Sequence, residues 1–263
     1  MDLGLRQRSC VVLASTRGLG LAAAEALLAE GARVALSGRD PARVAELRSR
    51  LAREHGERVS VDVLDVTALA ALRAHLAAVE ARWGSVDVLV VNSGGPAPVA
   101  ATELDAEALA RGLDGTLGYA AEAIHTVLPG MRARRWGRIV AMTSLAVRQP
   151  IPGLAISNAL RAGLTGYLKT LATEVAADGV LVNSICTGMF DTDRLRELFE
   201  KRAAKSGRTA EEERARTIAE IPAGRIGRPE EYGALVAFLA SERAAYLTGV
   251  ALAHDGGASR ALL

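Results

Sequence analysis

The sequence has 263 residues, half of them hydrophobic and 24% charged, so it can bury one large core without disulfide support. Its net charge is only +2 and it has no block of lysine and arginine, which argues against a nucleic-acid partner. Two cysteines, no apolar run of 18 residues and no signal-peptide pattern at the start lead us to expect a cytoplasmic protein without disulfides or a membrane span.

Short apolar runs alternate along the chain with longer amphipathic stretches. Continuous apolar runs are typical of parallel strands that are covered on both faces, and the stretches between them have helical character. This alternation predicts βαβ units in a single doubly wound domain over residues 1–263. The expected strands are 9–14, 33–37, 59–63, 86–91, 138–143, 180–185 and 250–253, and the expected helices are 19–30, 41–54, 67–83, 105–134, 154–178 and 229–240.

Residues 190–221 interrupt the alternation with a charged helical segment between the sixth and seventh strands. One interpretation is a solvated surface excursion. The other is a lid over a substrate cleft, since the segment follows the carboxyl end of a strand, where sheets of this kind bind ligands.

The first strand ends in a glycine turn, and a helix follows at once. Glycines at such a turn let the backbone approach a pyrophosphate, which is then bound by free N–H groups at the positive end of the helix. The turn therefore predicts a dinucleotide site formed by Ser15, Thr16, Arg17, Gly18, Leu19 and Gly20.

Arg39 follows the second strand, at the point where a protein that prefers NAD usually has an acid. Together with Arg17 it would suit a 2′-phosphate, which favours NADP, with NAD still possible. Asp40 is either a ribose acceptor or the cap of the helix that begins at Pro41.

The next two strands also end in residues suited to a cofactor. Asp65 and Val66 follow the third strand, and Asp65 could also place negative charge before the next helix. Asn92 and Gly94 follow the fourth strand, where small residues let a cofactor pass closely. We interpret Asp87 as a loop charge and Asp105 as a helix cap.

Taken together, these residues resemble the short-chain dehydrogenase/reductase family over nearly the whole chain. The family's glycine motif corresponds to residues 13–20, and its Asn-Asn-Ala-Gly motif corresponds to residues 92–95. Residues 221–225, 228–231, 238–241 and 255–257 are similar to the 3-oxoacyl-carrier-protein reductase branch. The resemblance implies a three-layer α/β/α Rossmann fold, a seven-stranded, mostly parallel sheet of order 3-2-1-4-5-6-7, an adenine contact at Asp65-Val66, and a homodimer or homotetramer.

The resemblance also assigns the catalytic positions, and there the sequence departs from the family. Ser144 fits the family's serine, but its tyrosine and lysine are replaced by Ser157 and Arg161. The family's asparagine falls on Thr116, and the Pro-Gly after the sixth strand has become Thr187-Gly188. Ala14 replaces the first glycine of the motif, and its Cβ limits the turn.

These replacements change what the site can do. The hydroxyl of Ser157 is a far weaker acid than a phenol, whose pKa is about 10. Arg161 can still bind ribose hydroxyls and supply positive charge, but it cannot relay a proton at neutral pH. Tyr167 is interpreted as a core or interface residue, and Tyr119 as a packing residue, with a replacement acid as the alternative for Tyr119.

Three functions remain open at this point. The protein could be a reductase of a carbonyl or acyl-thioester substrate, in which Ser144 and a water near Ser157 supply the proton and Arg161 stabilises the oxyanion. It could bind a dinucleotide without hydride chemistry, as a sensor or assembly subunit. It could also carry out non-redox acyl-thioester chemistry. The histidines and cysteines show no metal-ligand spacing, so we expect no metal site.

Overall fold

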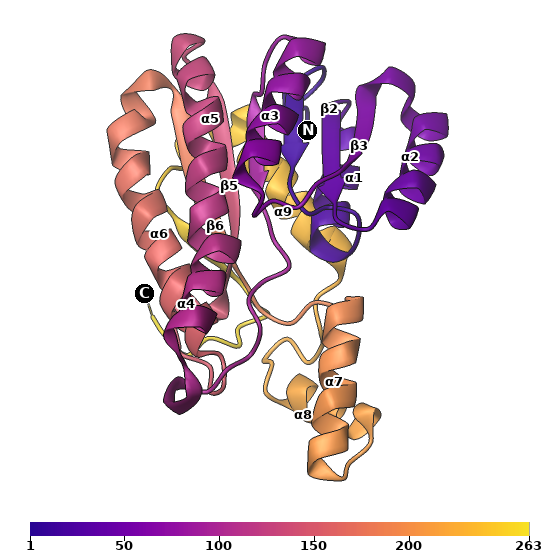
Figure 1. Cartoon of the computed structure of the whole chain (residues 1–263), viewed down its shortest axis with the longest axis vertical. Coiled ribbons are helices and arrows are strands. Elements are labelled where there is room, and N and C mark those ends of the chain that lie inside the picture. Colours follow the sequence, from indigo (N-terminus) through magenta and orange to yellow (C-terminus); the bar gives the residue numbers. More distant parts are fainter. Residues whose placement is uncertain (263) are drawn as a thin grey trace.

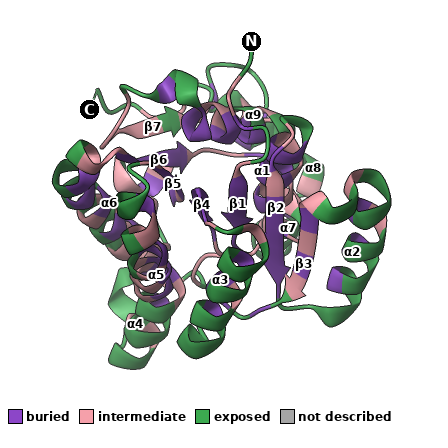
Figure 2. Ribbon diagram, turned by 90° about the horizontal axis from the view of Figure 1, so that it is seen from above, coloured by how far each residue is buried: buried purple, intermediate pink, exposed green. Residues whose placement is uncertain are grey.

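The computed structural model describes residues 1–262, and its centre is one parallel sheet in the order β3-β2-β1-β4-β5-β6-β7. This confirms the strand order and the fold class expected from the sequence. Every pair of neighbouring strands is parallel (Figures 1 and 2). The strands are β1 (Ser9–Val12), β2 (Arg33–Gly38), β3 (Val59–Val63), β4 (Val88–Val91), β5 (Gly137–Ser144), β6 (Val180–Thr187) and β7 (Ala251–His254).

Helices cover both faces of the sheet, which is why β1 and β4 are buried along their whole length. One face packs against α1, α2 and α9, and the other packs against α3, α5 and α6 (Figure 2). The helices are α1 (Gly18–Ala29), α2 (Pro41–His55), α3 (Leu69–Trp83), α4 (Ala106–Leu113), α5 (Tyr119–Ala133), α6 (Ala155–Val175), α7 (Asp193–Ser206), α8 (Ala210–Ala219) and α9 (Pro229–Ala240).

The single helix expected over residues 105–134 is confirmed as a continuous helical run over residues 106–133, but its hydrogen-bonding pattern changes part of the way along. A π-helical turn at residues 114–118 separates α4 from α5, and the N–H of Tyr119 donates to the carbonyl of Asp114. Gly112 lies against α6, where a Cβ would come within 2.3 Å of Ile156. Close packing at a glycine, followed by further glycines of low helix propensity, accounts for the π-helical turn. Asp105 is confirmed as the N-cap of α4.

The segment expected to be a helical insertion contains α7 and α8, which project from the body of the molecule (Figure 1). The two helices pack on a small apolar cluster of their own, made by Leu195, Phe199, Ile221 and Ile226. Phe190, at the start of the segment, is instead buried in the main core beside α9. The projecting part therefore begins at α7.

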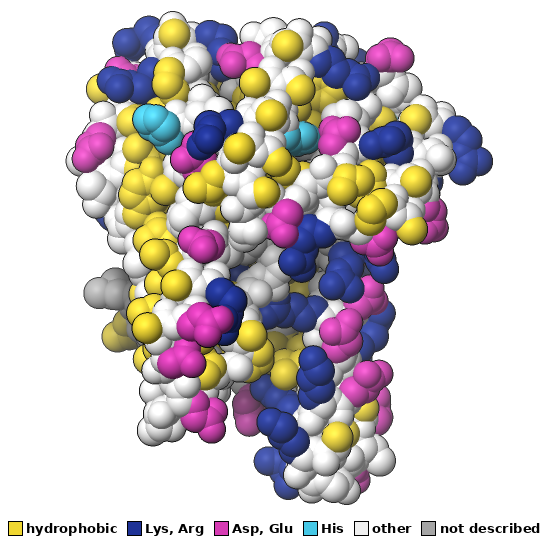
Figure 3. All heavy atoms as spheres, viewed as in Figure 1, with side chains coloured by type: hydrophobic (Ala, Val, Ile, Leu, Met, Phe, Trp, Pro, Cys, Tyr) yellow, Lys and Arg dark blue, Asp and Glu magenta, His cyan; other side chains and the backbone are white. Residues whose placement is uncertain are grey.

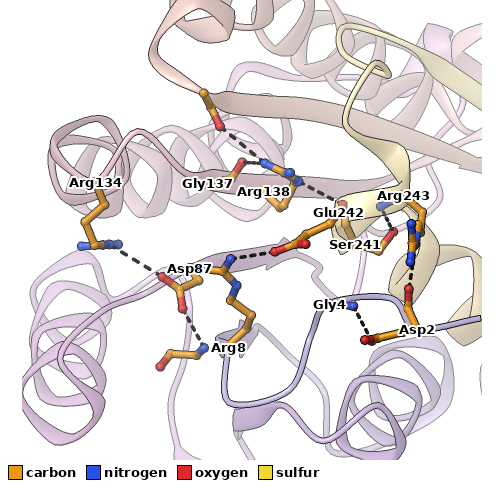
Figure 4. A network of polar contacts seen from close by, with 12 residues as sticks. Asp2, Gly4, Arg8, Asp87, Arg134, Gly137, Arg138, Ser241, Glu242 and Arg243 are labelled. Carbon is orange, nitrogen blue, oxygen red and sulfur yellow. Dashed lines mark hydrogen bonds and ion pairs between the residues drawn. The ribbon is translucent and has the colours of Figure 1, made fainter.

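A polar network closes the amino edge of the sheet, opposite the edge where the strands end (Figure 4). Arg8 and Arg138 both lie over the ring of Trp136, and Arg8 pairs with Glu242 at 3.0 Å. Burial, with the charge of Arg8 as the next cause, lowers the pKa of Arg138 to about 10. This network joins the start of the chain to β5 and to the segment after α9.

Asp87 is part of the same edge and is not the loop charge that we expected. Its side chain is buried, and one carboxylate oxygen accepts the N–H of Ser9 at 3.0 Å. The other oxygen lies 3.7 Å from the guanidinium of Arg134, at the end of α5 (Figure 4). Asp87 therefore ties β1 to the helix layer.

We predict that Asp87→Ala lowers the free energy of unfolding by about 2–3 kcal/mol, because the buried N–H of Ser9 and the charge of Arg134 both lose their partner. Urea denaturation measures this change. As a control, Glu107→Ala removes an exposed pair with Arg111 and should cost about 0.5 kcal/mol or less. A similar small loss for both variants would contradict the structural role of Asp87.

Candidate functional site: a dinucleotide cleft at the carboxyl edge

A cavity of about 460 Å³ lies at the carboxyl edge of the sheet. Its walls come from the segments that follow β1 to β4, together with β5 and the start of α7. The neighbours β1 and β4 are not consecutive in the chain, so the cavity lies where the connections turn to opposite sides of the sheet. The residues singled out from the sequence that line it are Thr16, Arg17, Gly18, Leu19, Gly20, Arg39, Asp65, Val66, Asn92 and Gly94.

The first turn of α1 faces this cavity with its backbone donors free of side-chain partners. Arg17 is the N-cap residue, but its side chain makes no capping hydrogen bond, and the turn contains no acid. Gly18 has a φ of +56°, and a Cβ on Gly94 would meet nothing within 4 Å. Free N–H groups, the positive end of a helix and open space above the backbone together suit a pyrophosphate.

Ala14 and Ser15 form the part of the turn that directly follows β1. The hydroxyl of Ser15 donates to the carbonyl of Val12 at 2.6 Å and accepts the N–H of Ser37, so it is already used within the fold. Ala14 has a φ of +48°, a conformation that favours glycine. The chain therefore keeps the turn of the glycine motif with an alanine held in a strained conformation.

Asn92 holds the turn in place from the neighbouring strand. Its amide nitrogen donates to the carbonyls of Leu13 and Ala14, at 3.1 and 2.9 Å. Its buried carbonyl oxygen has no partner within the described residues. A Cβ on Gly20 would lie 2.5 Å from that amide nitrogen, so the third glycine position lets Asn92 reach β1.

The charges at the end of β2 are divided between two tasks. Asp40 accepts the N–H groups of Ala42 and Arg43 through one carboxylate oxygen and so caps α2, and it also lines the cavity. Arg39 is 77% exposed and lies 4.0 Å from Asp65. The pKa of Asp65 is lowered, first by the backbone N–H of Thr67 and only lastly by Arg39. Arg39 therefore has a guanidinium that an incoming phosphate can reach.

The residues predicted to be catalytic follow β5 and begin α6. Ser144 ends β5, and its hydroxyl accepts the N–H of Ala146 at 3.1 Å. Ser157 is half-buried in the first turn of α6. Arg161, one turn further on, is only 7% exposed and donates to the carbonyl of Met142 at 2.7 Å. Burial is the main cause that lowers the pKa of Arg161.

Thr116 and Tyr119 lie on and next to the π-helical turn. The hydroxyl of Thr116 is buried and has no partner within residues 1–262. Ser93 connects this turn to β4 by donating to the carbonyl of Gly115. Tyr119 is buried, and its burial raises the pKa of the phenol, whereas the Ser93 hydroxyl and the charge of Arg161 act in the opposite direction.

Several cavity residues were missed by the sequence analysis. They include Arg43, which lies one turn into α2, and the group Thr192, Asp193 and Arg194 at the start of α7. The rule that ligands lie beyond strand ends points to the segment after β6, but it does not say which side chains turn inward. Six residues that we predicted lie outside the lining: Ser15, Thr116, Ser144, Ser157, Arg161 and Gly188. Gly188 instead packs against Asp255, where a Cβ would come within 2.7 Å of its backbone.

Among the residues that the structure describes, no group of three or more histidine, cysteine, aspartate or glutamate side chains is placed to hold a metal ion. None of the helices in residues 1–262 has the length and apolar character needed to cross a membrane.

Comparisons with known proteins agree with this geometry. Residues 13–259 match the family model described as enoyl-(acyl carrier protein) reductase. The chain is 40% identical over 131 residues to 3-oxoacyl-[acyl-carrier-protein] reductase FabG of Vibrio cholerae serotype O1, a match that covers 50% of this chain and 49% of that protein. The matched stretch thus spans about half the length of the curated relatives.

Solved structures match over almost the entire chain. L-sorbose reductase from Gluconobacter frateurii, complexed with NADPH and L-sorbose, has a TM-score of 0.94 and 32% identity, with 100% of both chains covered. A short-chain oxidoreductase of Pseudomonas aeruginosa PAO1, NADPH-bound and described as containing an atypical catalytic centre, has a TM-score of 0.87 and 33% identity, with 97% and 99% covered.

We predict that Ala14→Gly raises the free energy of unfolding by about 0.5–1 kcal/mol, because glycine adopts a positive φ without the steric cost of a Cβ. The midpoint of urea unfolding reports this change. The same substitution in the exposed interior of α2, Ala52→Gly, should instead lower stability by about 1 kcal/mol. If both variants were destabilised alike, the strain assigned to Ala14 would be absent.

Proposed function

The chain belongs to the short-chain dehydrogenase/reductase family, and from that membership we propose that it is an NADP-dependent oxidoreductase. It would transfer hydride between the nicotinamide and a carbonyl or hydroxyl carbon of a small-molecule substrate. The observation that carries this proposal is the uncapped amino end of α1, which faces the cavity with Gly18 and Gly94 beside it. Several similar solved structures are described as bound to NADPH or NADP, which supports the same cofactor.

NADP rather than NAD is favoured by the charges around the end of β2. Arg17, Arg39 and Arg43 all line the cavity and can meet a 2′-phosphate. The nearby acids are already used, because Asp40 caps α2 and Asp65 accepts from Thr67. Each of these acids uses one carboxylate oxygen in this way, whereas a phosphate would find exposed guanidinium groups.

The bound nicotinamide supplies the hydride, and this chain's own residues would orient the substrate and provide the proton. We propose that Ser144 orients the reacting oxygen and that the proton comes from solvent held near Ser144 and Ser157. Arg161 stays charged and stabilises negative charge that develops on the oxygen, as electrostatic catalysis requires. Thr116 stands in for the family's asparagine. This atypical set replaces the tyrosine and lysine of the family.

The same replacements favour a second candidate function. Ser157 and Arg161 provide no group that can donate a proton as a tyrosine would, so the chain could bind the dinucleotide without hydride chemistry, as a sensor or an assembly subunit. Non-redox chemistry on an acyl thioester would likewise use the cleft without hydride transfer.

We also propose that residues 190–221 act as a lid over the substrate within a single domain, since Thr192 and Arg194 line the cavity.

A cytoplasmic homodimer or homotetramer is part of the proposal. Two large apolar side chains of α4, Leu109 and Leu113, are 41% and 42% exposed, as suits a helix that packs on a second subunit.

The reductase proposal predicts consumption of NADPH with at least one member of a panel of 3-oxoacyl thioesters and simple ketones. Ser144→Ala should lower kcat at least about a hundredfold, because it removes a hydroxyl that positions the reacting oxygen. A decrease in NADPH absorbance measures both. Binding of NADPH with no turnover on the whole panel would favour the second candidate function, and full activity of the variant would rule out the role of Ser144.

The cofactor proposal predicts that Arg39→Asp reduces the preference for NADPH over NADH by about tenfold or more, because a carboxylate repels the 2′-phosphate and accepts the ribose hydroxyls. Titration calorimetry with both cofactors measures the ratio. The control is Arg53→Asp, on the exposed far end of α2. An equal ratio of NADPH affinity to NADH affinity in the two variants would mean that Arg39 does not bind the 2′-phosphate.

A further inference from the structure

Two guanidinium groups converge over Gly95, in the segment that follows β4. The position that a Cβ would take on Gly95 lies 2.7 and 3.1 Å from the two terminal nitrogens of Arg194, and 3.2 Å from Nη2 of Arg161. The three nitrogens therefore surround one point at the wall of the cavity. Gly95 has a φ of +71°, so glycine serves both the turn and the space that the arginines occupy.

The carboxylate whose charge acts on Arg194 is that of Glu197, and Glu197 itself pairs with Arg17 at 4.0 Å. Neither Arg161 nor Arg194 forms an ion pair with a carboxylate within the described residues. Arg161 is 7% exposed and uses one terminal nitrogen, Nη1, on the carbonyl of Met142. The pKa of Arg161 is lowered first by burial, and Arg194 is the nearby charge that lowers it further. Two like charges held this close, one of them buried, are costly unless an anion joins them.

The charged groups of the cofactor have other places to bind. The amino end of α1 suits the pyrophosphate, and Arg39 and Arg43 are placed for the 2′-phosphate at the far end of the cavity. Arg161 comes instead from α6 and donates to Met142, which lies two residues before the end of β5. Arg194 comes from α7, on the segment proposed as a lid. The pair thus lies between the start of α6 and the glycine turn, whose Arg17 is the other positive charge that acts on Arg194.

We propose that Arg161 and Arg194 bind an anionic group of the substrate, a carboxylate or a phosphate. The substrate would then be an oxo acid or a phosphorylated carbonyl compound rather than a neutral ketone. Arg194 lies on the surface of the molecule, so an anion can reach it from solvent, whereas Arg161 forms the buried end of the site. Basic side chains gather on this face between the body and the projecting α7 (Figure 3). This inference takes the identity of the cofactor from the proposed function. The positions of the two arginines do not depend on that function.

The test is titration calorimetry on the full chain loaded with NADP⁺, so that no reduction takes place. The matched probes are acetoacetate and its ethyl ester, which differ in charge. We expect acetoacetate to bind at least about tenfold more tightly than the ester. Arg194→Gln should remove that difference in affinity without changing the affinity for the ester. Arg194→Lys should restore part of it, since a lysine keeps the charge but not the planar fork.

Arg196→Gln is the control on the same helix, because Arg196 is paired with Asp191 and Asp193 at the surface. It should bind both probes as the wild-type chain does. Equal affinity of the wild-type chain for the two probes would overturn the proposal, as would a preference that survives in Arg194→Gln. A loss of NADP⁺ affinity in Arg194→Gln of tenfold or more would also overturn it, because the anion would then be a phosphate of the cofactor. If the wild-type chain does not bind NADP⁺, the proposed function fails, and the same comparison on the nucleotide-free protein decides the anion site separately.

Discussion

The uncapped amino end of α1, held at the point where β1 and β4 lie side by side, is the feature on which the rest of the site depends. A helix end of this kind has free N–H groups and partial positive charge, so it favours an anion in the space above it. Asn92 fixes that end by bonding two carbonyls of the preceding turn. The turn keeps its shape even though the positive φ of Ala14 is sterically unfavourable. The two hydrogen bonds from Asn92 hold Leu13 and Ala14 in this turn despite the strain at Ala14.

Charge is distributed around this turn so that the cleft stays cationic. The acids nearest to it serve the fold, since Asp40 caps α2 and Asp65 accepts from Thr67. Arginines come to the cleft from the glycine turn, from the end of β2, from α6 and from α7. The opposite edge of the sheet uses its charges differently, because there Asp87, Arg8 and Arg138 are paired with protein groups and hold the chain together (Figure 4). One edge thus provides stability and the other is left free to bind ligands.

Most of the fold could be predicted from the sequence, because continuous apolar runs, glycine turns and helix caps are local signals. The strand order followed from the family resemblance, and β2 and β3 were located to within one residue. The π-helical turn between α4 and α5 was missed, since it depends on how closely Gly112 packs against α6, and no local pattern reports such a contact. Arg194 was missed for the same reason: its residue type suits the exposed face of a charged helix, and only the tertiary structure turns it toward Gly95. The residues of the glycine turn that line the cavity were easier to predict than Arg194, because backbone turns carry a stronger sequence signal than single side chains do.

The most direct test of this account is a crystal structure of the protein grown with NADPH. The account predicts that the pyrophosphate lies over the N–H groups of residues 18–20 and that the 2′-phosphate lies beside Arg39, with the nicotinamide toward Ser144 and Arg161. A nucleotide bound elsewhere on the chain, or one bound in the cleft with its 2′-phosphate away from Arg39, would contradict it.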